Sequence, residues 1–455
     1  MTEDPDDVIP PPHDDDRTLV LCFDGTGDQF DEDNSNIVQF FSMLKKDDPS
    51  QQMVYYQAGL GTYTIPQIAT PLYAKLSKTI DAMVGSNLDA HVMAGYEFLM
   101  QNCEICLFGF SRGAYTARAL AGMLHKVGLL PPCNHQQVPF AYKMYSKDDD
   151  EGWKQSKAFK KAFSIDVDVQ FVGVWDTVNS VGIIPHKLPF TKANNKIRYF
   201  RHALALDEHR ARFMPNFCNR STDADNKFGV QKGEMPRSTK KSRPVQNPHD
   251  KLLHEGSSLN GHHQEPNLQD RERRYTESIS QTDADEVWFA GCHCDVGGGS
   301  VKNGTRHSLA RIPLRWMIRE IFKTNVGILF HRSMLRHVGM DPSTLYPEVT
   351  PRPPAIFERP FLPEKIDSGT PYHDDGVPIQ CATKGNFVSE EMEDLKDALS
   401  PMYDQLEEAP YWWILEMLPQ KQRYQREDDT WIGDVKVNMG GGRDIPKRHT
   451  PKIHR

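Results

Sequence analysis

The sequence lacks a long apolar run. No stretch approaches the roughly 20 residues that a membrane-spanning helix needs, and hydrophobic residues make up only 38% of the 455 positions. The mean hydropathy is -0.61. Residues 1–16 are rich in Asp and Pro and contain neither the cationic start nor the apolar segment of a signal peptide. We therefore expect a soluble protein that is not secreted by that route, with a disordered acidic lead over residues 1–16.

An excess of positive charge is also missing. The 54 Lys and Arg residues are outnumbered by 62 Asp and Glu residues, and the two signs are interspersed along the chain. This distribution gives no basic footprint, so we expect no nucleic-acid partner. The eight cysteines are scattered, and several lie inside apolar, strand-like runs. We therefore expect reduced thiols and a cytoplasmic location.

What the chain does contain is an alternation of short β-rich runs with helical stretches. This order favours a mainly parallel sheet covered by helices on both faces, and so an α/β fold. Residues 197–206 fit either a strand or a helix. The strands are expected at residues 18–23, 53–56, 105–108, 167–175 and 286–290, and the helices at residues 36–44, 77–100, 114–127 and 311–322.

The composition divides the chain into a large domain and a smaller region. We assign residues 17–345 to one large α/β domain. Within it, residues 220–285 are polar with almost no periodic apolar positions, which predicts a flexible insertion. Residues 346–455 are expected to form a small C-terminal region, partly helical and partly irregular.

The pattern G-x-S-x-G occurs at residues 109–113, between an expected strand and an expected helix. In a nucleophile elbow the serine occupies a strained turn, so the positions two residues away on either side must be small. Gly109 and Gly113 meet this demand around Ser111. The N-terminus of the following helix also favours negative charge developing beside the serine. The alternative is an ordinary turn, because the bare pattern is short; the strand before it and the helix after it favour the elbow.

An elbow serine needs an acid and a base later in the chain, in the order Ser, Asp or Glu, His. Asp176 ends an expected strand, where the carboxyl edge of a parallel sheet collects functional residues. His293 follows the next clear strand, so both candidates fall in the required order. His202 and His209 stay open as alternative bases, and their alternative role is that of surface or salt-bridged histidines.

Two further histidines and one cluster are less suited to the site. His125 lies on the elbow helix about three turns from the serine, and His307 lies in a polar loop. Cys292, His293 and Cys294 offer metal-ligand chemistry, but neighbours along an extended segment point to opposite sides. We therefore expect no metal site and no cofactor. The glycines at residues 297–299 are interpreted as a turn that brings the histidine segment close to the substrate.

Five motifs follow one another along the chain: LCFDGTG (21–27), GFSRGAYTAR (109–118), FVGVWDTV (171–178), DEHR (207–210) and WFAGCHCDVGGG (288–299). In this order they resemble the motifs of a known family, the α/β-hydrolase catalytic domain similar to type VI secretion phospholipase effectors. The resemblance extends over about residues 17–322, and the motifs look most like those of fungal members, which are intracellular. It implies an α/β-hydrolase-like fold, with residues 17–345 as the α/β-hydrolase catalytic domain.

The resemblance implies a catalytic triad with Ser111 as nucleophile, Asp176 as acid and His293 as base. It implies hydrolysis of carboxylic esters, with phospholipids as a substrate class. The chemistry is acyl transfer to water through an acyl-enzyme.

The resemblance also places the loop of Asp24, Gly25 and Thr26 beside the site. There, one backbone N–H of the loop would complete an oxyanion hole together with the backbone N–H of Arg112.

Two rival functions remain open from the sequence. The chain could be a hydrolase-fold protein that binds or scaffolds without catalysis, or a cytosolic hydrolase of small soluble esters. The apolar stretch at residues 411–418, with Trp412 and Trp413, could contact lipid as an interfacial helix or serve as a core or lid helix. We thus expect a small-molecule or lipid ester substrate and a peripheral membrane contact, while the oligomeric state is left open.

Overall fold

The chain is described by a computed structural model. The described residues are 7–12, 17–26, 28–59, 88–101, 104–178, 188–191, 194, 196–218, 282–355, 389–425, 431–445 and 450–454.

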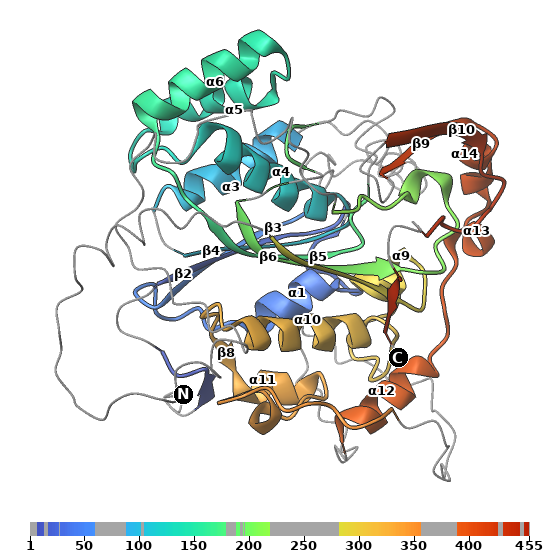
Figure 1. The fold of residues 1–455 in the computed structure, drawn as a ribbon. Helices are drawn as coiled ribbons and strands as arrows, with labels where there is room; N and C mark the ends of the chain where they lie inside the picture. The colour runs from blue at the N-terminus through green and yellow to red at the C-terminus, as the bar shows by residue number, and fades with distance from the viewer. Residues whose placement is uncertain are drawn as a thin grey trace, which may run out of the picture.

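The described residues form a central sheet of seven strands, all paired in parallel (Figure 1). The strand order is β11-β7-β6-β5-β4-β2-β3. This parallel sheet with helices around it is the α/β-hydrolase-like fold expected from the sequence. The bounds are β2 (Thr18–Phe23), β3 (Gln52–Gln57), β4 (Glu104–Phe110), β5 (Val169–Trp175), β6 (Ile197–Ala205), β7 (Asp283–Phe289) and β11 (Lys452–Ile453).

Helices cover both faces of the sheet (Figure 1). None of those in the described ranges has the length and apolar character needed to cross a bilayer. One face carries α3 (Leu88–Leu99), α4 (Ser111–Val127), α5 (Val138–Ser146) and α6 (Asp150–Phe163), and the other carries α1 (Asn36–Met43), α10 (Arg311–Thr324) and α11 (Arg332–His337).

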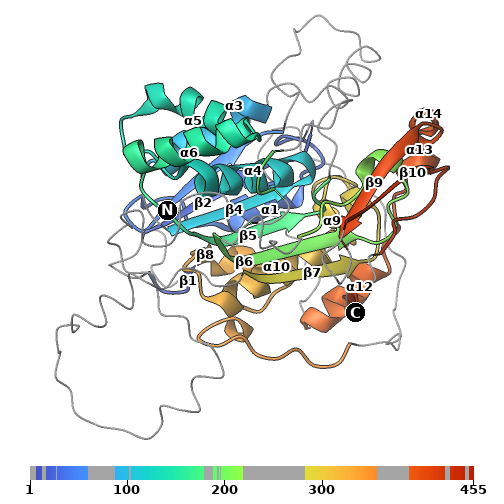
Figure 2. The same cartoon turned by 45° about the horizontal axis from the view of Figure 1, so that its top comes forward.

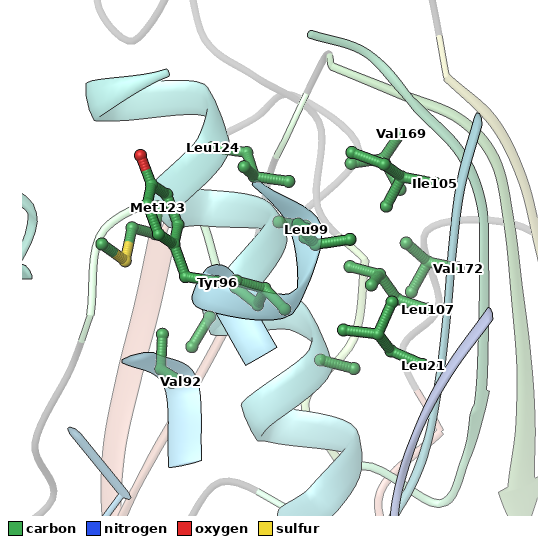
Figure 3. Packing of buried hydrophobic residues seen from close by; sticks show 14 of the residues in the cluster. Leu21, Val92, Tyr96, Leu99, Ile105, Leu107, Met123, Leu124, Val169 and Val172 are labelled. Carbon is green, nitrogen blue, oxygen red and sulfur yellow. The ribbon is translucent and has the colours of Figure 1, made fainter. Parts of the chain in front are cut away.

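The strand β2 is apolar because it has a hydrophobic core on each of its two faces. Successive side chains point to opposite faces. Leu19 and Leu21 enter the core under α3 and α4, whereas Val20 and Cys22 enter the core under α1 and α10. Figure 3 shows the first of these cores, in which Leu21 and its neighbours on the sheet pack against Tyr96 and other helix residues.

The strand order reverses between β2 and β4. The chain leaves β2 for β3 on one side, and leaves β4 for β5 on the other side. Ligands of open α/β sheets bind where the strand order reverses in this way, outside the carboxyl ends of the strands. The loop after β2 and the turn after β4 therefore meet at the position expected for a functional site.

The ambiguous segment at residues 197–206 is a strand, β6, which lies between β5 and β7. Its central position satisfies backbone hydrogen bonds on both sides. Residues 220–281 of the predicted insertion lie outside the described residues. Its last residues, from Asp283 on, form the start of β7.

The disorder expected for residues 1–16 does not extend to Val8 and Ile9, which form β1. This strand pairs antiparallel with β8 (Phe330–His331). Ile9 is buried in the core between the sheet and the helices α1 and α10. Burial of this apolar side chain offsets the entropy cost of ordering the segment. The acidic and proline-rich composition around Ile9 gave no sign of this burial.

The C-terminal region contains strands besides its helices. It contains an antiparallel hairpin of β9 (Pro419–Gln425) and β10 (Trp431–Val437), and β11 extends the main sheet. Near the hairpin lie α13 (Gln405–Glu408) and α14 (Trp413–Glu416), beyond one end of the sheet and close to α9 (His293–Gly297) in both views (Figures 1 and 2). The region is therefore built onto the α/β domain rather than separate from it.

Candidate active site

Ser111 stands at the junction of β4 and α4, which follow each other without a spacer. Its φ of 58° lies in the left-handed region, which is strained for a residue other than glycine. A methyl group at Gly109 would lie 2.5 Å from the carbonyl oxygen of Gly113, and one at Gly113 would lie 2.2 Å from the carbonyl oxygen of Phe23. These close approaches explain both flanking glycines and hold the serine at the start of α4, against the end of β2.

Asp176 follows β5 directly and is fully buried. Its φ of 39° is again in the left-handed region. The backbone N–H of Ala205, at the end of β6, donates to Oδ1 of this carboxylate at 2.9 Å. The neighbouring strand therefore fixes the carboxylate at the same edge of the sheet as Ser111.

His293 is the first residue of the short helix α9, which follows β7. Its Nδ1 lies 2.5 Å from Oδ2 of Asp176, and its Nε2 lies 2.8 Å from Oγ of Ser111. Because the carboxylate can only accept, Nδ1 is the donor, and Nε2 is left to accept the serine hydroxyl. The structure thus brings the three predicted site residues into one hydrogen-bonded chain.

Burial lowers the pKa of His293, and the hydrogen bond and the charge of Asp176 oppose that shift. The imidazole is therefore neutral near pH 7 and able to accept a proton. Burial alone would raise the pKa of the Asp176 carboxyl, but the charge of Arg443 and hydrogen bonds from His293 and Arg443 hold it below its usual range. A neutral base between a serine and an ionised carboxylate is the arrangement that activates a hydroxyl nucleophile.

Two aromatic rings enclose the imidazole. The ring of Phe110 lies 4.7 Å from the ring of His293 between centroids, and that of Phe213 lies 4.8 Å away in an edge-on arrangement. The backbone N–H of His293 donates to Oε2 of Glu208 at 3.2 Å, and Glu208 is itself paired with Arg210. These contacts fix both the ring and the backbone of the histidine.

The loop after β2 lies against the elbow, as a methyl group at Gly25 would fall 2.8 Å from the Phe110 ring. The backbone N–H of Gly25 donates to Oδ1 of Asp24 at 2.8 Å. The Asp24 carboxylate also accepts from Ser35 and Tyr56 and is buried, so it organises the loop. The Thr26 hydroxyl oxygen is buried and makes no hydrogen bond to any part of the chain that the structure describes.

The alternative histidines have other partners. His202 is buried in β6, where its Nε2 accepts the N–H of Thr177 at 3.0 Å and its Nδ1 bonds Glu286. His209 bonds Asp404 at 2.7 Å. His125 and His307 bond Asn194 and Asp397, respectively. Each imidazole is thus occupied by groups other than Ser111.

The thiol of Cys292, beside His293, has a partner of its own. The Cys292 thiol donates to the carbonyl oxygen of Asp207 at 3.1 Å. Among the described residues, no group of three or more His, Cys, Asp or Glu side chains is arranged to hold a metal ion.

Sequence reasoning missed Arg443, which reaches the site from the C-terminal region. Its Nη1 lies 2.6 Å from Oδ1 of Asp176 and its Nη2 lies 2.8 Å from Oδ2. The only local signal is the run of glycines just before this arginine, which permits close approach of the backbone. Nothing in the sequence links that run to a residue 267 positions earlier.

The fold is of the α/β-hydrolase class, and Ser111 lies at the switch point of the sheet. The chain belongs to the family described as T6SS, Phospholipase effector Tle1-like, catalytic domain, whose model matches residues 17–320. It is therefore a phospholipase-like hydrolase.

Two further similarities were found. The chain is 27% identical over 534 aligned residues to the uncharacterized protein YEL023C of Saccharomyces cerevisiae, covering 95% of this chain and 77% of that protein. A solved structure of the Tle1 effector bound to the VgrG spike from the type 6 secretion system is similar at 16% identity. The match covers 64% of this chain and about half, 52%, of that chain, with a TM-score of 0.28, too low to support an argument about the site.

Proposed function

We propose that the protein is a serine esterase that cleaves carboxylic esters of lipids, with phospholipids as the substrate class. Ser111 Oγ attacks the acyl carbon while His293 Nε2 takes its proton. The histidine then protonates the departing alcohol, which leaves an acyl-enzyme. Water, deprotonated by the same nitrogen, releases the acid and restores Ser111, with Asp176 stabilising the imidazolium in both halves.

The observation that carries this proposal is the hydrogen-bonded chain from Oγ of Ser111 through His293 to Asp176, at 2.8 and 2.5 Å. Its distances are those that proton transfer requires. The strained φ at Ser111 adds support, because such strain persists where function requires it. Family membership supplies the ester and lipid chemistry.

We assign the oxyanion hole to the backbone N–H of Arg112, at the start of α4, and to Thr26. The N–H of Gly25 is used by the Asp24 carboxylate. The buried hydroxyl of Thr26 is a donor in this loop whose hydrogen bond a substrate oxygen could complete. Asp24 and Gly25 then shape the loop rather than contact the substrate oxygen.

Labelling by a fluorophosphonate probe tests the assignment, because only an activated serine displaces the fluoride. Ser111→Ala should abolish labelling and ester turnover. His293→Ala should be nearly as severe, and Asp176→Asn milder because it acts through the histidine. The double change Ser111→Ala with His293→Ala should cost little more than either alone, since residues acting as a unit are not additive.

His209→Gln is the matched control, since His209 also pairs with a carboxylate but lies outside the hydrogen-bonded chain. We expect it to label like the wild type. Retained activity in His293→Ala with loss in His209→Gln would mean that the base is misassigned. An unlabelled wild type would favour a non-catalytic binding protein, and turnover of short soluble esters without turnover of vesicle lipid would favour a small-ester hydrolase.

We also propose that the surface formed by α14, the strand β10 of the hairpin and the residues beside them contacts the lipid surface. Trp412 packs edge-on against Phe213, which in turn packs against His293. Next to Trp412, large apolar side chains are exposed on α14 and β10 and just beyond them, a clustering typical of interaction surfaces. These residues are Tyr411, Trp413, Ile414, Met417, Leu418, Val435, Val437 and Met439.

Sedimentation with phosphatidylcholine vesicles tests the contact. Changing Trp413 and Ile414 to serine should weaken vesicle binding and lipid turnover at least severalfold, while hydrolysis of a short soluble ester is unchanged. Phe140→Ser is the control, because the exposure of Phe140, 57%, lies between those of Trp413 and Ile414, 41% and 64%, but Phe140 lies on α5. Equal vesicle binding by all variants would refute the lipid contact.

A further inference from the structure

Arg443 stands out among the buried charged groups that the proposed reaction does not use. It lies beyond residue 320, where the match to the family model ends. Its side chain is only 2% exposed. The two outer nitrogens of its guanidinium bind the two oxygens of Asp176, and they also donate to the carbonyl oxygens of Ala205 and Phe213. Such a planar fork fixes both the position and the rotation of a carboxylate.

The guanidinium shares one carboxylate oxygen with the histidine. Nη2 of Arg443 and Nδ1 of His293 both donate to Oδ2 of Asp176. A positive charge behind the carboxylate weakens its pull on the imidazole proton and disfavours a second positive charge on the ring. The arrangement therefore orients the acid and reduces its electrostatic help to the base at the same time.

We propose that Arg443 is a positioning residue of the active site, by which the C-terminal region fixes Asp176 and lowers the basicity of His293. This inference rests on the proposed function. It makes the residues after the matched region part of the working site.

The neighbouring segments support a fixed attachment of this arginine. Glu416, in α14, accepts from the N–H of Ala211 at 2.5 Å, and from Asn438 and the N–H of Gly440. Asn438 also donates to the carbonyl oxygen of His209. The turn that carries Arg443 is thus held to the segment between β6 and the insertion.

The other charges around His293 must be kept constant for a test. Besides Asp176 and the arginine behind it, charged groups near this imidazole include Arg210, which lowers its pKa, and Glu208, which raises it. Both are held in their own buried ion pair. Replacement of Arg443 leaves that pair in place, so a change in the pH profile reports on the arginine behind the acid.

The test is the pH dependence of the second-order rate of fluorophosphonate labelling. In Arg443→Met we expect the midpoint of the acid limb to rise by about one pH unit, because the unopposed carboxylate makes His293 a stronger base that must lose its proton at higher pH. The plateau rate should fall by about tenfold or more as the acid loses its position. In Arg443→Lys the charge remains and the fork is lost, so the plateau should fall while the midpoint stays.

Arg319→Met is the matched control, since Arg319 is also buried and also holds the C-terminal region, through Glu390 on α12 (Glu390–Ala398). It should leave the midpoint in place. A lower plateau with an unchanged midpoint in Arg443→Met would overturn the electrostatic role. If that variant does not fold, a wild-type plateau in Arg443→Lys overturns the positioning role. Failure of the wild type to label, or labelling of Ser111→Ala, would instead refute the proposed function.

Discussion

The packing of Gly297 against Phe110 gives a sharp test of how the site is held. A methyl group at Gly297 would lie 1.8 Å from Cε2 of Phe110 and 2.1 Å from Cδ2. Carbon atoms pack at about 3.5 Å or more, so Gly297→Ala demands a displacement of roughly 1.7 Å. The ring cannot simply retreat, because it is buried and Gly25 lies close to its other edge.

The expected cost is about 1–3 kcal/mol of unfolding free energy, the range for overpacked cores. Alanine is favoured over glycine in a helix by up to about 1 kcal/mol, which offsets part of this cost but not its sign. The displaced ring also lies against His293 and precedes Ser111. Because a misplacement of about 1 Å can cost about a hundredfold in rate, the labelling rate should fall by at least tenfold.

Urea unfolding and the fluorophosphonate labelling rate measure the two effects. Gly442→Ala is the control, since its added methyl would meet no atom closer than 3.8 Å. Phe110→Ala removes the ring that is struck, so adding Gly297→Ala to that variant should cost less than about 1 kcal/mol. A Gly297→Ala protein with wild-type stability and labelling would refute the reasoning.

Two further predictions concern stability. Burial, together with the charges of Lys160 and Lys196, lowers the pKa of His125 to about 3. Between about pH 6.5 and 3, the unfolded chain therefore binds a proton at this histidine that the folded chain does not, and the free energy of unfolding falls by about 1.4 kcal/mol for each pH unit of acidification. His125→Gln should reduce this pH dependence of the free energy of unfolding by about that amount; an unchanged pH dependence would contradict this. Asp397 is fully buried and bonds Arg315 at 2.6 Å and Arg311 at 3.2 Å. Asp397→Asn weakens both charge-assisted bonds, while Arg315 keeps Asp394 and Arg311 keeps Glu393, so we expect a loss of about 1.5–3 kcal/mol in urea unfolding. A loss below about 1 kcal/mol would show that the ion pairs of Asp397 with α10 add little.

Much of the α/β layout could be predicted because its signals are local. The apolar run of β4, the glycines around Ser111 and the small residues of α4 follow one another in the chain, and each restricts its own backbone. The order Ser111, Asp176, His293 could be proposed because parallel strands bring their carboxyl ends to one edge. The segment of β6 was ambiguous because a central strand and a buried helix share the same apolar composition.

What the sequence determined by itself is the strand, turn and helix around Ser111 and the set of strand-end residues that could serve it, because these depend on steric limits within a few neighbouring residues. Only the tertiary structure decided which histidine reaches Ser111 and that Arg443 reaches Asp176. These contacts join residues 182 and 267 positions apart. They depend on strand order and on the burial of charges against their partners, and neither leaves a periodic trace in the chain.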